Sequence, residues 1–368
     1  MKKLTIVGVG LIGGSVGLGL KRIKAPFYII GTSRNIENLK KAYKVGAVDY
    51  YTTDFIEATK DSDIVMICVP VEKIVLFTEN IIDTLKKGCI ITDAGSTKSE
   101  ILKKIDRLII KKRKAVYFVG AHPLAGSEKT GVEFAKGHLF ENAYCLITPG
   151  KTSCDKIDEI KDLWKSLNAI VVEMDAYVHD KIVGAISHLP HIVATALINT
   201  VGRNCSNIAG LDALSFAASG FRDTTRIAGS DAGLWKDIFL SNRKAILPLI
   251  DKFINELNRF KRYISPDRKD KLIETLNTAK GFKDRVSGLS HKGIIPGGFE
   301  IYLDVEDRVG VIASISGILR DVKINIKDIA VVKSREDGSG ALRIGFESDE
   351  DRNFAMKVLK EKGFSVFR

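Results

Sequence analysis

Short apolar segments alternate with longer amphipathic ones along the first half of the chain. Each apolar run is followed by a stretch with helical periodicity, which is the pattern of a parallel sheet buried on both faces. The pattern ends with a predicted helix over Asp155–Leu167. We place the end of this domain near Val172, where the alternation of strands and helices stops. The sequence therefore predicts a doubly wound α/β sheet. The expected strands are Leu4–Val7, Phe27–Gly31, Asp63–Val69, Gly88–Asp93, Val116–Gly120 and Ala143–Thr148.

The middle of the chain follows a different pattern. From Asp175 to about Lys280 the periodicity is helical throughout, with no alternating strand candidate. Long apolar helices of this kind often pair between subunits. We therefore expect an all-α domain that binds substrate and forms a homodimer.

A third pattern begins after Ser287–Gly298, a segment rich in glycine and serine that is typical of a linker. Beyond it, strands and helices follow the order of a βαββαβ ferredoxin-like unit. The expected elements are strand Phe299–Val305, helix Val311–Asp321, two strands, helix Asp351–Lys362 and strand Phe364–Phe367. The chain is thus predicted to have three domains, at residues 1–172, 173–286 and 298–368.

Length and composition agree with this division. A chain of 368 residues suits two or three domains, and an apolar fraction of 45% suits globular folding. The five cysteines form no CxxC pair, which indicates reduced thiols in a cytoplasmic protein. No apolar run reaches about 18 charge-free residues without interruption by glycine, so we expect no membrane-spanning helix.

The net charge of +12 raises the question of nucleic-acid binding. The positive excess lies before residue 298, mostly as lysines scattered over predicted helix faces, with one dense run at Lys111–Lys114. The sequence has no nucleic-acid motif and no aromatic residues interleaved with the basic ones. The charge therefore indicates a solvated surface that attracts anionic substrates.

A GxGxxG motif, formed by Gly8, Gly10 and Gly13, directly follows the first predicted strand and opens a helix. Gly8 suits a tight turn, Gly10 lets the backbone approach a pyrophosphate, and Gly13 lets the helix pack on the strand. A secretory signal peptide is the alternative, but the run contains many glycines and has no cleavage site. The motif predicts a dinucleotide site, for which the candidate residues are Gly8, Gly10, Leu11, Ile12, Gly13, Ser33, Arg34, Val69 and Pro70.

The residues after the second strand bear on the choice of dinucleotide. An NAD-selective fold usually places an acid here, but the chain has Thr32-Ser33-Arg34-Asn35, and Glu37 lies further on. A hydroxyl and a guanidinium suit a 2′-phosphate, which favours NADP. If Arg34 only stacks on adenine, either NADP or NAD would fit.

Two polar residues follow neighbouring strands at the edge where such sheets bind ligands. His122 follows the Val116–Gly120 run, and Ser96 follows Gly88–Asp93. A neutral imidazole at this edge can take a proton from a substrate hydroxyl while hydride leaves the same carbon. We therefore predict that His122 is a general base.

The helical region holds a second set of polar candidates. His188 and His191 are three residues apart, but Pro190 lies between them and no acid is beside them, so we expect no metal site. Ser187 and His191 are four apart on one expected helical face, which suits hydrogen bonds to a ligand.

Arg222, Asp223 and Arg226 form a further charged group. One possibility is a surface ion-pair network, which contributes little to stability. The alternative is that Arg226 binds a substrate carboxylate while Asp223 holds Arg222, and we favour it for Arg226.

Five motifs occur in an order and spacing that resemble the prephenate dehydrogenase family: GVGLIGGS, DAGSTK, GAHPLAGSE, SHLPH and GFRDTTRIA. The tail, with DRVG at a strand–helix turn, resembles an ACT regulatory domain. The resemblance covers essentially the whole chain, and arogenate dehydrogenases share the motifs. It implies oxidative decarboxylation of prephenate to 4-hydroxyphenylpyruvate in tyrosine biosynthesis, with arogenate as the alternative substrate.

The resemblance also implies residue roles. His122 would act as the base on the ring hydroxyl, and Ser96 would orient that hydroxyl and the nicotinamide. His191 would position the substrate side chain, and Arg226 would hold a carboxylate. The other residues expected at the substrate are Ser127, Glu128, Ser187 and Trp235.

The ACT-like tail implies a regulatory site. Its turn, Asp307, Val309 and Gly310, leads into a helix N-terminus that suits the carboxylate of a small amino acid. Such turns bind pathway end products across two subunits, so the resemblance implies inhibition by L-tyrosine. A nucleotide-sensing protein without catalysis is the alternative from another class, but His122, Ser96 and Arg226 together argue against it.

Overall fold

The computed structural model describes residues 1–126, 130–151, 154–205, 207–288, 299–306, 309–332 and 339–367. The chain divides into two compact units, Met1–Leu272 and Ile273–Arg368. The division falls inside one helix, α12 (Lys269–Gly288).

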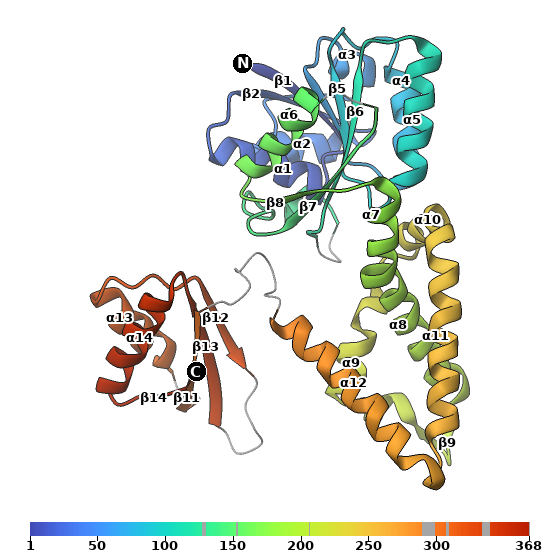
Figure 1. Cartoon of the computed structure of the whole chain (residues 1–368). Coiled ribbons are helices and arrows are strands. Elements are labelled where there is room, and N and C mark those ends of the chain that lie inside the picture. The colour runs from blue at the N-terminus through green and yellow to red at the C-terminus, as the bar shows by residue number, and fades with distance from the viewer. Residues whose placement is uncertain are drawn as a thin grey trace. The chain divides into compact units, whose positions relative to one another are not determined.

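One eight-stranded sheet forms the centre of the N-terminal half of the first unit (Figure 1). Its strand order is β3-β2-β1-β4-β5-β6-β7-β8, and neighbours are parallel except that β7 runs antiparallel to β6. The strands are β1 (Lys2–Val7), β2 (Phe27–Thr32), β3 (Tyr50–Thr52), β4 (Ile64–Ile67), β5 (Ile90–Asp93), β6 (Tyr117–Pro123), β7 (Tyr144–Pro149) and β8 (Ile170–Glu173). The predicted doubly wound sheet is confirmed, although the apolar pattern did not reveal β3 and β8.

Both faces of this sheet are covered, as the alternation along β4 illustrates. Ile64 and Met66 belong to one hydrophobic core, whereas Val65 and Ile67 belong to another. The first core includes side chains of α1 (Leu11–Arg22), α2 (Ile36–Lys44) and α6 (Cys154–Ser166), and the second includes those of α4 (Ile74–Ile81) and α5 (Ser99–Lys112). A short helix, α3 (Phe55–Thr59), precedes β4.

The rest of the first unit is mostly helical, as predicted. Its helices are α7 (Ala176–Val183), the π-helical turn η3 (Gly184–His188), α8 (Leu189–Asn204), α9 (Ser219–Thr225), α10 (Ala232–Ser241) and α11 (Arg243–Tyr263). The prediction that this region holds no strand is wrong at one point. A small hairpin of β9 (Asn207–Ile208) and β10 (Leu211–Asp212) turns through Ala209 and Gly210, both at positive φ.

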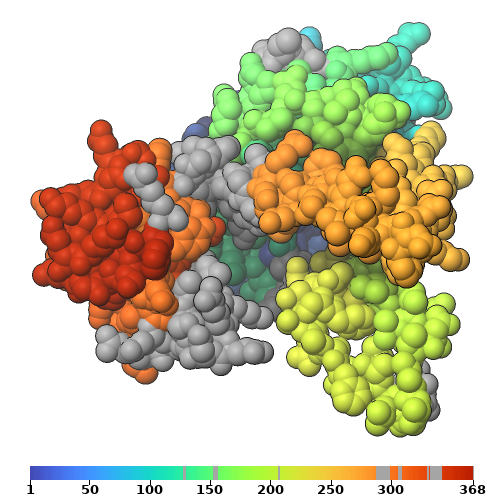
Figure 2. Space-filling model, turned by 60° about the horizontal axis from the view of Figure 1, so that its bottom comes forward, coloured from blue at the N-terminus to red at the C-terminus, as the bar shows by residue number. Residues whose placement is uncertain are grey.

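Exposed apolar side chains gather on the lobe that carries this hairpin. Ile208, Leu211 and Phe216 are all more than half exposed. Figure 2 shows this segment in yellow-green and yellow, open on the drawn face of the molecule. An apolar surface of this kind is typical of an interaction site.

The continuous helical segment Ala176–Asn204 is long and apolar enough to cross a membrane by length and composition alone. It nevertheless contains His179, Asp180 and His188, which are buried against other residues of the same unit. Buried, hydrogen-bonded polar side chains of this kind are unusual in a membrane-spanning helix, so only its length and composition suggest one.

The second unit contains a four-stranded antiparallel sheet in the order β12-β13-β11-β14. Its elements are β11 (Phe299–Glu306), α13 (Val311–Asp321), β12 (Asp328–Val332), β13 (Ser339–Phe346), α14 (Asp349–Glu361) and β14 (Ser365–Phe367). Both helices contribute to one apolar core, for example Ile315 and Leu359, so the predicted ferredoxin-like order is confirmed. Ser287 and Gly288 of the predicted linker belong to α12 instead, and residues 289–298 lie outside the described residues.

Candidate active site

The glycine turn after β1 is held by close backbone packing. Gly8 has φ +92°, and a Cβ atom there would lie 2.5 Å from the carbonyl oxygen of Cys68. A Cβ on Gly13 would lie 2.3 Å from the carbonyl oxygen of Gly8, whereas one on Gly10 would meet no atom within 4 Å. Gly8 and Gly13 are therefore required by the fold, and Gly10 leaves open space at the start of α1.

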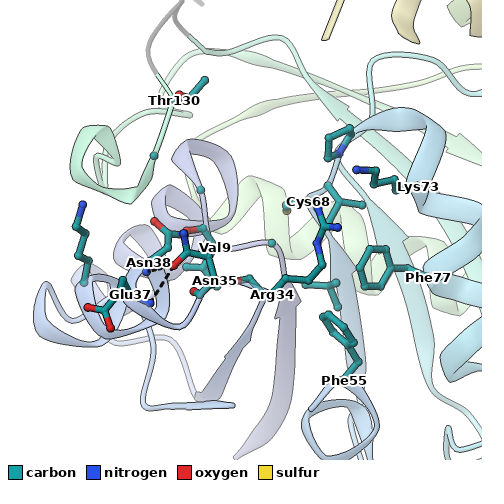
Figure 3. Close-up of a pocket in the computed structure, with 18 of the residues that line it drawn as sticks. Val9, Arg34, Asn35, Glu37, Asn38, Phe55, Cys68, Lys73, Phe77 and Thr130 are labelled. Carbon is teal, nitrogen blue, oxygen red and sulfur yellow. Dashed lines mark hydrogen bonds between the residues drawn. The ribbon is translucent and has the colours of Figure 1, made fainter. Parts of the chain in front are cut away.

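A cleft of about 560 Å³ lies beside this turn (Figure 3). The helix α1 begins at Leu11, and no side chain caps its N-terminus, so the first N–H groups are available to an anion. Leu11, Ile12 and Gly13 form this first turn. The other predicted cofactor residues line the cleft, namely Gly8, Gly10, Ser33, Arg34, Val69 and Pro70. This open glycine turn and the uncapped helix fit the pyrophosphate of a dinucleotide.

The far end of the cleft has no acid directly after β2. The hydroxyl of Ser33 donates to the carbonyl oxygen of Asn35 over 3.1 Å, and the Asn35 side chain caps α2. Glu37 lines the cleft, but its carboxylate pairs with Lys40 at 2.8 Å. Arg34 lies along the cleft near Lys73 and Phe77, and it has no ion-pair partner in the described part of the chain.

His122 lies near the carboxyl end of β6, on the same sheet edge as the glycine turn. The neighbouring strand β5 ends at Asp93, whose carboxylate accepts a hydrogen bond from the backbone N–H of Ala121 over 3.2 Å. This bond fixes the backbone immediately before His122.

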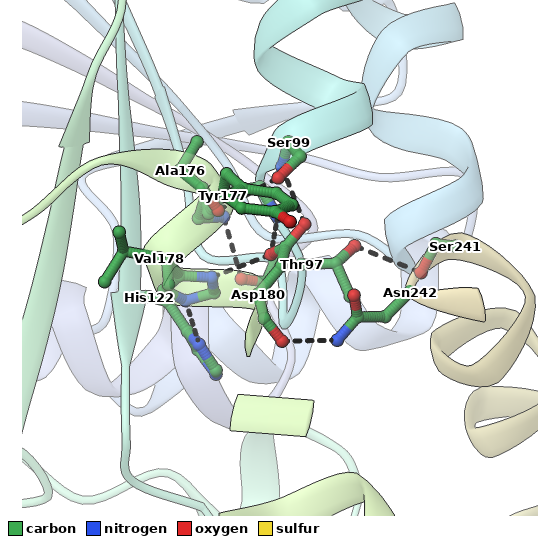
Figure 4. Close-up of polar contacts among 12 residues, drawn as sticks. Thr97, Ser99, His122, Ala176, Tyr177, Val178, Asp180, Ser241 and Asn242 are labelled. Carbon is green, nitrogen blue, oxygen red and sulfur yellow. Dashed lines mark hydrogen bonds and ion pairs between the residues drawn. The ribbon is translucent and has the colours of Figure 1, made fainter. Parts of the chain in front are cut away.

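The side chain of His122 belongs to a chain of hydrogen bonds that reaches into the helical region (Figure 4). Its Nδ1 lies 2.9 Å from Nε2 of His179, and Nδ1 of His179 lies 2.8 Å from Oδ1 of Asp180. The Asp180 carboxylate also accepts the backbone N–H groups of Lys98, at 2.8 Å, and Ser99, at 2.9 Å. Sequence reasoning missed His179 and Asp180, which lie in the middle of α7, shortly after the domain boundary predicted near Val172.

Burial keeps these imidazoles neutral. Desolvation lowers the pKa of His122 well below its usual 6.5, and the nearby His179, Lys98 and His188 lower it further. Desolvation also lowers the pKa of His179, against the opposing effect of its hydrogen bond to Asp180. The pKa of His188 falls to about 4 for the same main reason. At neutral pH, His122 can therefore accept a proton.

A fully buried ion pair holds the turn that carries Ser96. The ammonium of Lys98 lies 2.5 Å from Oδ2 of Asp93 and also donates to the carbonyl oxygen of Gly95 over 2.8 Å. The hydroxyl of Thr97 lies 3.0 Å from that of Ser241 in α10. Ser96 itself is partly exposed between β5 and α5, and the sheet edge brings its turn next to the strand of His122.

The helical side of the site contains an aromatic stack. His191 is buried and lies 3.7 Å from Trp235 between ring centroids, at an interplanar angle of 14°. Its Nδ1 is buried without a partner among the described residues. Trp235 also meets His188 edge-on, and Asn242 joins His188 Nδ1 to the carbonyl oxygen of Asp180. The structure thus connects His191 and Trp235 to His122 through one set of contacts.

Ser187 is the next predicted substrate residue along the chain. Ser187 is exposed while His191 is buried, and their joint role in binding a ligand stays a prediction. The π-helical turn η3 interrupts the regular α-helical spacing there. Ser127 and Glu128 lie outside the described residues.

Arg226 is exposed in the turn η5 (Arg226–Gly229), which packs against α8. Asp223 and Arg222 are exposed and form no ion pair with each other, so the prediction that Asp223 holds Arg222 is wrong. An exposed aspartate and arginine gain little from pairing in water.

The predicted effector turn is described only in part. Gly310 has φ +90° and precedes α13, and Val309 is fully exposed. Asp307 lies outside the described residues. Among the described residues, no group of three or more His, Cys, Asp or Glu side chains is placed to hold a metal ion.

Comparison with known proteins follows the same division of the chain. Residues 16–173 match the prephenate dehydrogenase nucleotide-binding domain, and residues 175–278 match the prephenate dehydrogenase dimerization domain. Over 361 residues the chain is 38% identical to prephenate dehydrogenase of Bacillus subtilis, covering 98% of this chain and 96% of that protein. The chain belongs to the prephenate dehydrogenase family. Prephenate dehydrogenases are oxidoreductases of tyrosine biosynthesis, and this chain is one of them.

Solved structures of prephenate dehydrogenases share this fold. The prephenate dehydrogenase of Aquifex aeolicus, in complex with hydroxyphenyl propionate and NAD+, superposes with a TM-score of 0.72 at 32% identity, covering 78% of this chain and 98% of that chain. The arogenate dehydrogenase of Synechocystis gives a TM-score of 0.67 at 30% identity, covering 77% of this chain and 99% of that chain. Residues 301–362 match an ACT domain like that of the AHAS small subunit, so this prephenate dehydrogenase carries a C-terminal ACT domain.

Proposed function

We propose that His122 is the general base of this prephenate dehydrogenase and that the cleft beside Gly10 binds the dinucleotide. The observation that carries the proposal is a neutral, partly buried imidazole at the sheet edge where α/β proteins bind their ligands. The substrate would lie between His122 and the His191–Trp235 stack, with Ser96 orienting its ring hydroxyl. The residue roles, including a carboxylate contact for Arg226, are those that the family resemblance implies.

The protein groups act at named atoms of prephenate. When bound, the dinucleotide supplies a nicotinamide that accepts hydride from ring C4. His122 takes the proton of the C4 hydroxyl as that hydride leaves. The bond between C1 and its carboxylate then breaks, carbon dioxide departs, and the electron pair completes the aromatic ring. His122 returns the proton to the phenolic oxygen of 4-hydroxyphenylpyruvate, so no net proton is released.

The largest contribution of the protein is orientation, because aromatisation supplies the driving force. The fixed backbone at Ala121 and the hydrogen bond to His179 hold His122 in place. The indole of Trp235 and the unpartnered Nδ1 of His191 offer an apolar face and a polar atom to the side chain of the substrate.

The residues that follow β2, at one end of the cleft, bear on whether NADP or NAD binds there. Ser33 and Arg34 line it, and neither is an acid that would repel a 2′-phosphate. We therefore propose that NADP serves at least as well as NAD, although the related Aquifex structure contains NAD+.

One assay tests substrate and dinucleotide together. Formation of reduced cofactor is measured with prephenate or arogenate, and with NADP or NAD, for the wild type and for Arg34→Ala. Prephenate should be the better substrate, and Arg34→Ala should lower kcat/KM for NADP by about tenfold while leaving NAD within threefold. Arg107→Ala, an exposed arginine of α5, is the matched control. If arogenate alone is turned over, the substrate assignment is wrong, and if NADP is never preferred and Arg34→Ala changes nothing, Arg34 does not bind the 2′-phosphate.

The remaining assignments concern assembly and regulation. The dimerization domain and its exposed apolar lobe support a homodimer. The ACT domain supports binding of L-tyrosine, the end product of the pathway, at the turn before α13. Membership of this biosynthetic family supports a cytoplasmic location.

A further inference from the structure

Asp180, His179 and His122 form a chain of hydrogen bonds. The charge of Asp180 determines which atom donates and which accepts in each of them. Asp180 accepts hydrogen bonds from two backbone N–H groups and from His179. These bonds outweigh burial and lower the pKa of the Asp180 carboxyl, so it remains ionised at neutral pH. An ionised carboxylate only accepts hydrogen bonds. The hydrogen between Asp180 and His179 therefore belongs to Nδ1 of His179.

The state of His179 follows from this assignment. A neutral imidazole carries one hydrogen, and in His179 it lies on Nδ1, so Nε2 is an acceptor. The group 2.9 Å from Nε2 of His179 is Nδ1 of His122, which must donate. Neutral His122 therefore carries its one hydrogen on Nδ1. Its Nε2 has a lone pair and no hydrogen, a state called bare below.

We propose that His179 and Asp180 are positioning residues that fix His122 in the tautomer with hydrogen on Nδ1 and a bare Nε2. This inference rests on the proposed role of His122 as the base, because only a bare nitrogen can take the substrate proton. Without the pair, His122 would divide between two tautomers and two ring orientations, and part of the population would present N–H to the substrate hydroxyl.

The His179–Asp180 pair also links the orientation of His122 to the packing of the helical region against the sheet. His122 lies on β6 of the sheet, whereas His179 and Asp180 lie on α7. The Asp180 carboxylate is held by backbone N–H groups at the start of α5, so one side chain fixes both the helix and the tautomer.

The tautomer is measured directly by nitrogen NMR of the full-length protein labelled with ¹⁵N-histidine, at neutral pH and without substrate. The resonances of His122 are assigned by their loss in His122→Asn. The proposal expects hydrogen on Nδ1 of His122 and none on Nε2. Hydrogen on Nε2 would overturn it. Because this measurement needs no turnover, its outcome is independent of whether prephenate is the substrate.

Kinetics of paired variants provide the second test. His179→Leu removes the acceptor for Nδ1 of His122, so kcat should fall about tenfold to a hundredfold with KM for prephenate within threefold. His179→Gln keeps an oxygen to accept from His122 and an N–H to donate to Asp180, so it should recover most of kcat. His138→Gln, at an exposed histidine, is the control and should change neither constant. If His179→Leu keeps full kcat, or if Leu and Gln give the same kcat, the pair does not position the base.

Discussion

His191 of α8 lies flat against Trp235 of α10, with ring centroids 3.7 Å apart and planes 14° from parallel. The stack buries His191 and leaves its Nδ1 without a partner among the described residues. A buried polar atom with no partner is costly unless a ligand or water satisfies it. The stack therefore presents one oriented polar atom beside an aromatic face, which suits a substrate that is itself a ring with a polar side chain.

Trp235→Leu should raise KM for prephenate by about threefold to tenfold, because a stacked aromatic pair contributes about 0.5–1.5 kcal/mol beyond its buried area. Trp235→Phe keeps an aromatic face and should stay within twofold of the wild type. Steady-state kinetics with saturating dinucleotide give both values. Equal KM for the Leu and Phe variants would mean that the stack does not orient the substrate.

Two glycines of the same motif should respond differently to alanine. Gly13→Ala places a Cβ 2.3 Å from the carbonyl oxygen of Gly8, so it should lower the free energy of unfolding by about 1–3 kcal/mol. Gly10→Ala meets no protein atom within 4 Å and should leave that free energy within about 0.5 kcal/mol. It should instead weaken dinucleotide binding, because the added methyl would occupy the space of the pyrophosphate. Urea unfolding and a binding titration separate the two effects, and unchanged affinity in Gly10→Ala would place the pyrophosphate elsewhere.

The fold could be predicted largely from the sequence because apolar runs and helical periodicity report burial directly. Strand β3 was not predicted, because Tyr50–Thr52 is short and only partly buried. Strand β8 was not predicted either, because Ile170–Glu173 lacks a fully buried run. The β9–β10 hairpin escaped because two-residue strands have too few positions to show alternation.

The candidate site could be predicted only where a residue lies at a strand end or within a motif. His122 and Gly10 satisfy that condition. His179 and Asp180 do not, because they act through contacts with residues 57 and 82 positions away in the chain. Likewise, periodicity could not anticipate the π-helical turn Gly184–His188, which contains Ser187 and ends before His191.

The ACT domain should confer inhibition by L-tyrosine. A chain that ends after residue 293 should remain active, and tyrosine should no longer inhibit it. In the full-length chain, Gly310→Val should weaken inhibition without changing kcat, because Gly310 has φ +90°, which valine adopts only with strain. Initial rates over a range of tyrosine concentrations test both variants. Inhibition of equal potency in the shortened chain would indicate that tyrosine competes at the active site.

The pH dependence of kcat should reflect the lowered pKa of His122. Burial and the neighbouring His179, Lys98 and His188 favour the neutral ring, so His122 becomes protonated only well below pH 6.5. Asp93, which pairs with Lys98, and Asp180, which bonds to His179, are the acids around this group. Because the neutral form is the active one, kcat should be constant from about pH 6.5 to 8 and fall only in more acidic buffer. A half-maximal rate at or above pH 7 would require another titrating group.

The most direct test of the account is the turnover of His122→Asn with saturating prephenate and dinucleotide, measured beside its dinucleotide affinity. Asparagine is smaller than histidine and cannot take a proton. If His122 is the base, kcat falls by about 10²–10⁴ while the Kd of the dinucleotide stays within about threefold of the wild type. A kcat within threefold of the wild type would remove His122 from the chemistry and contradict the proposed mechanism.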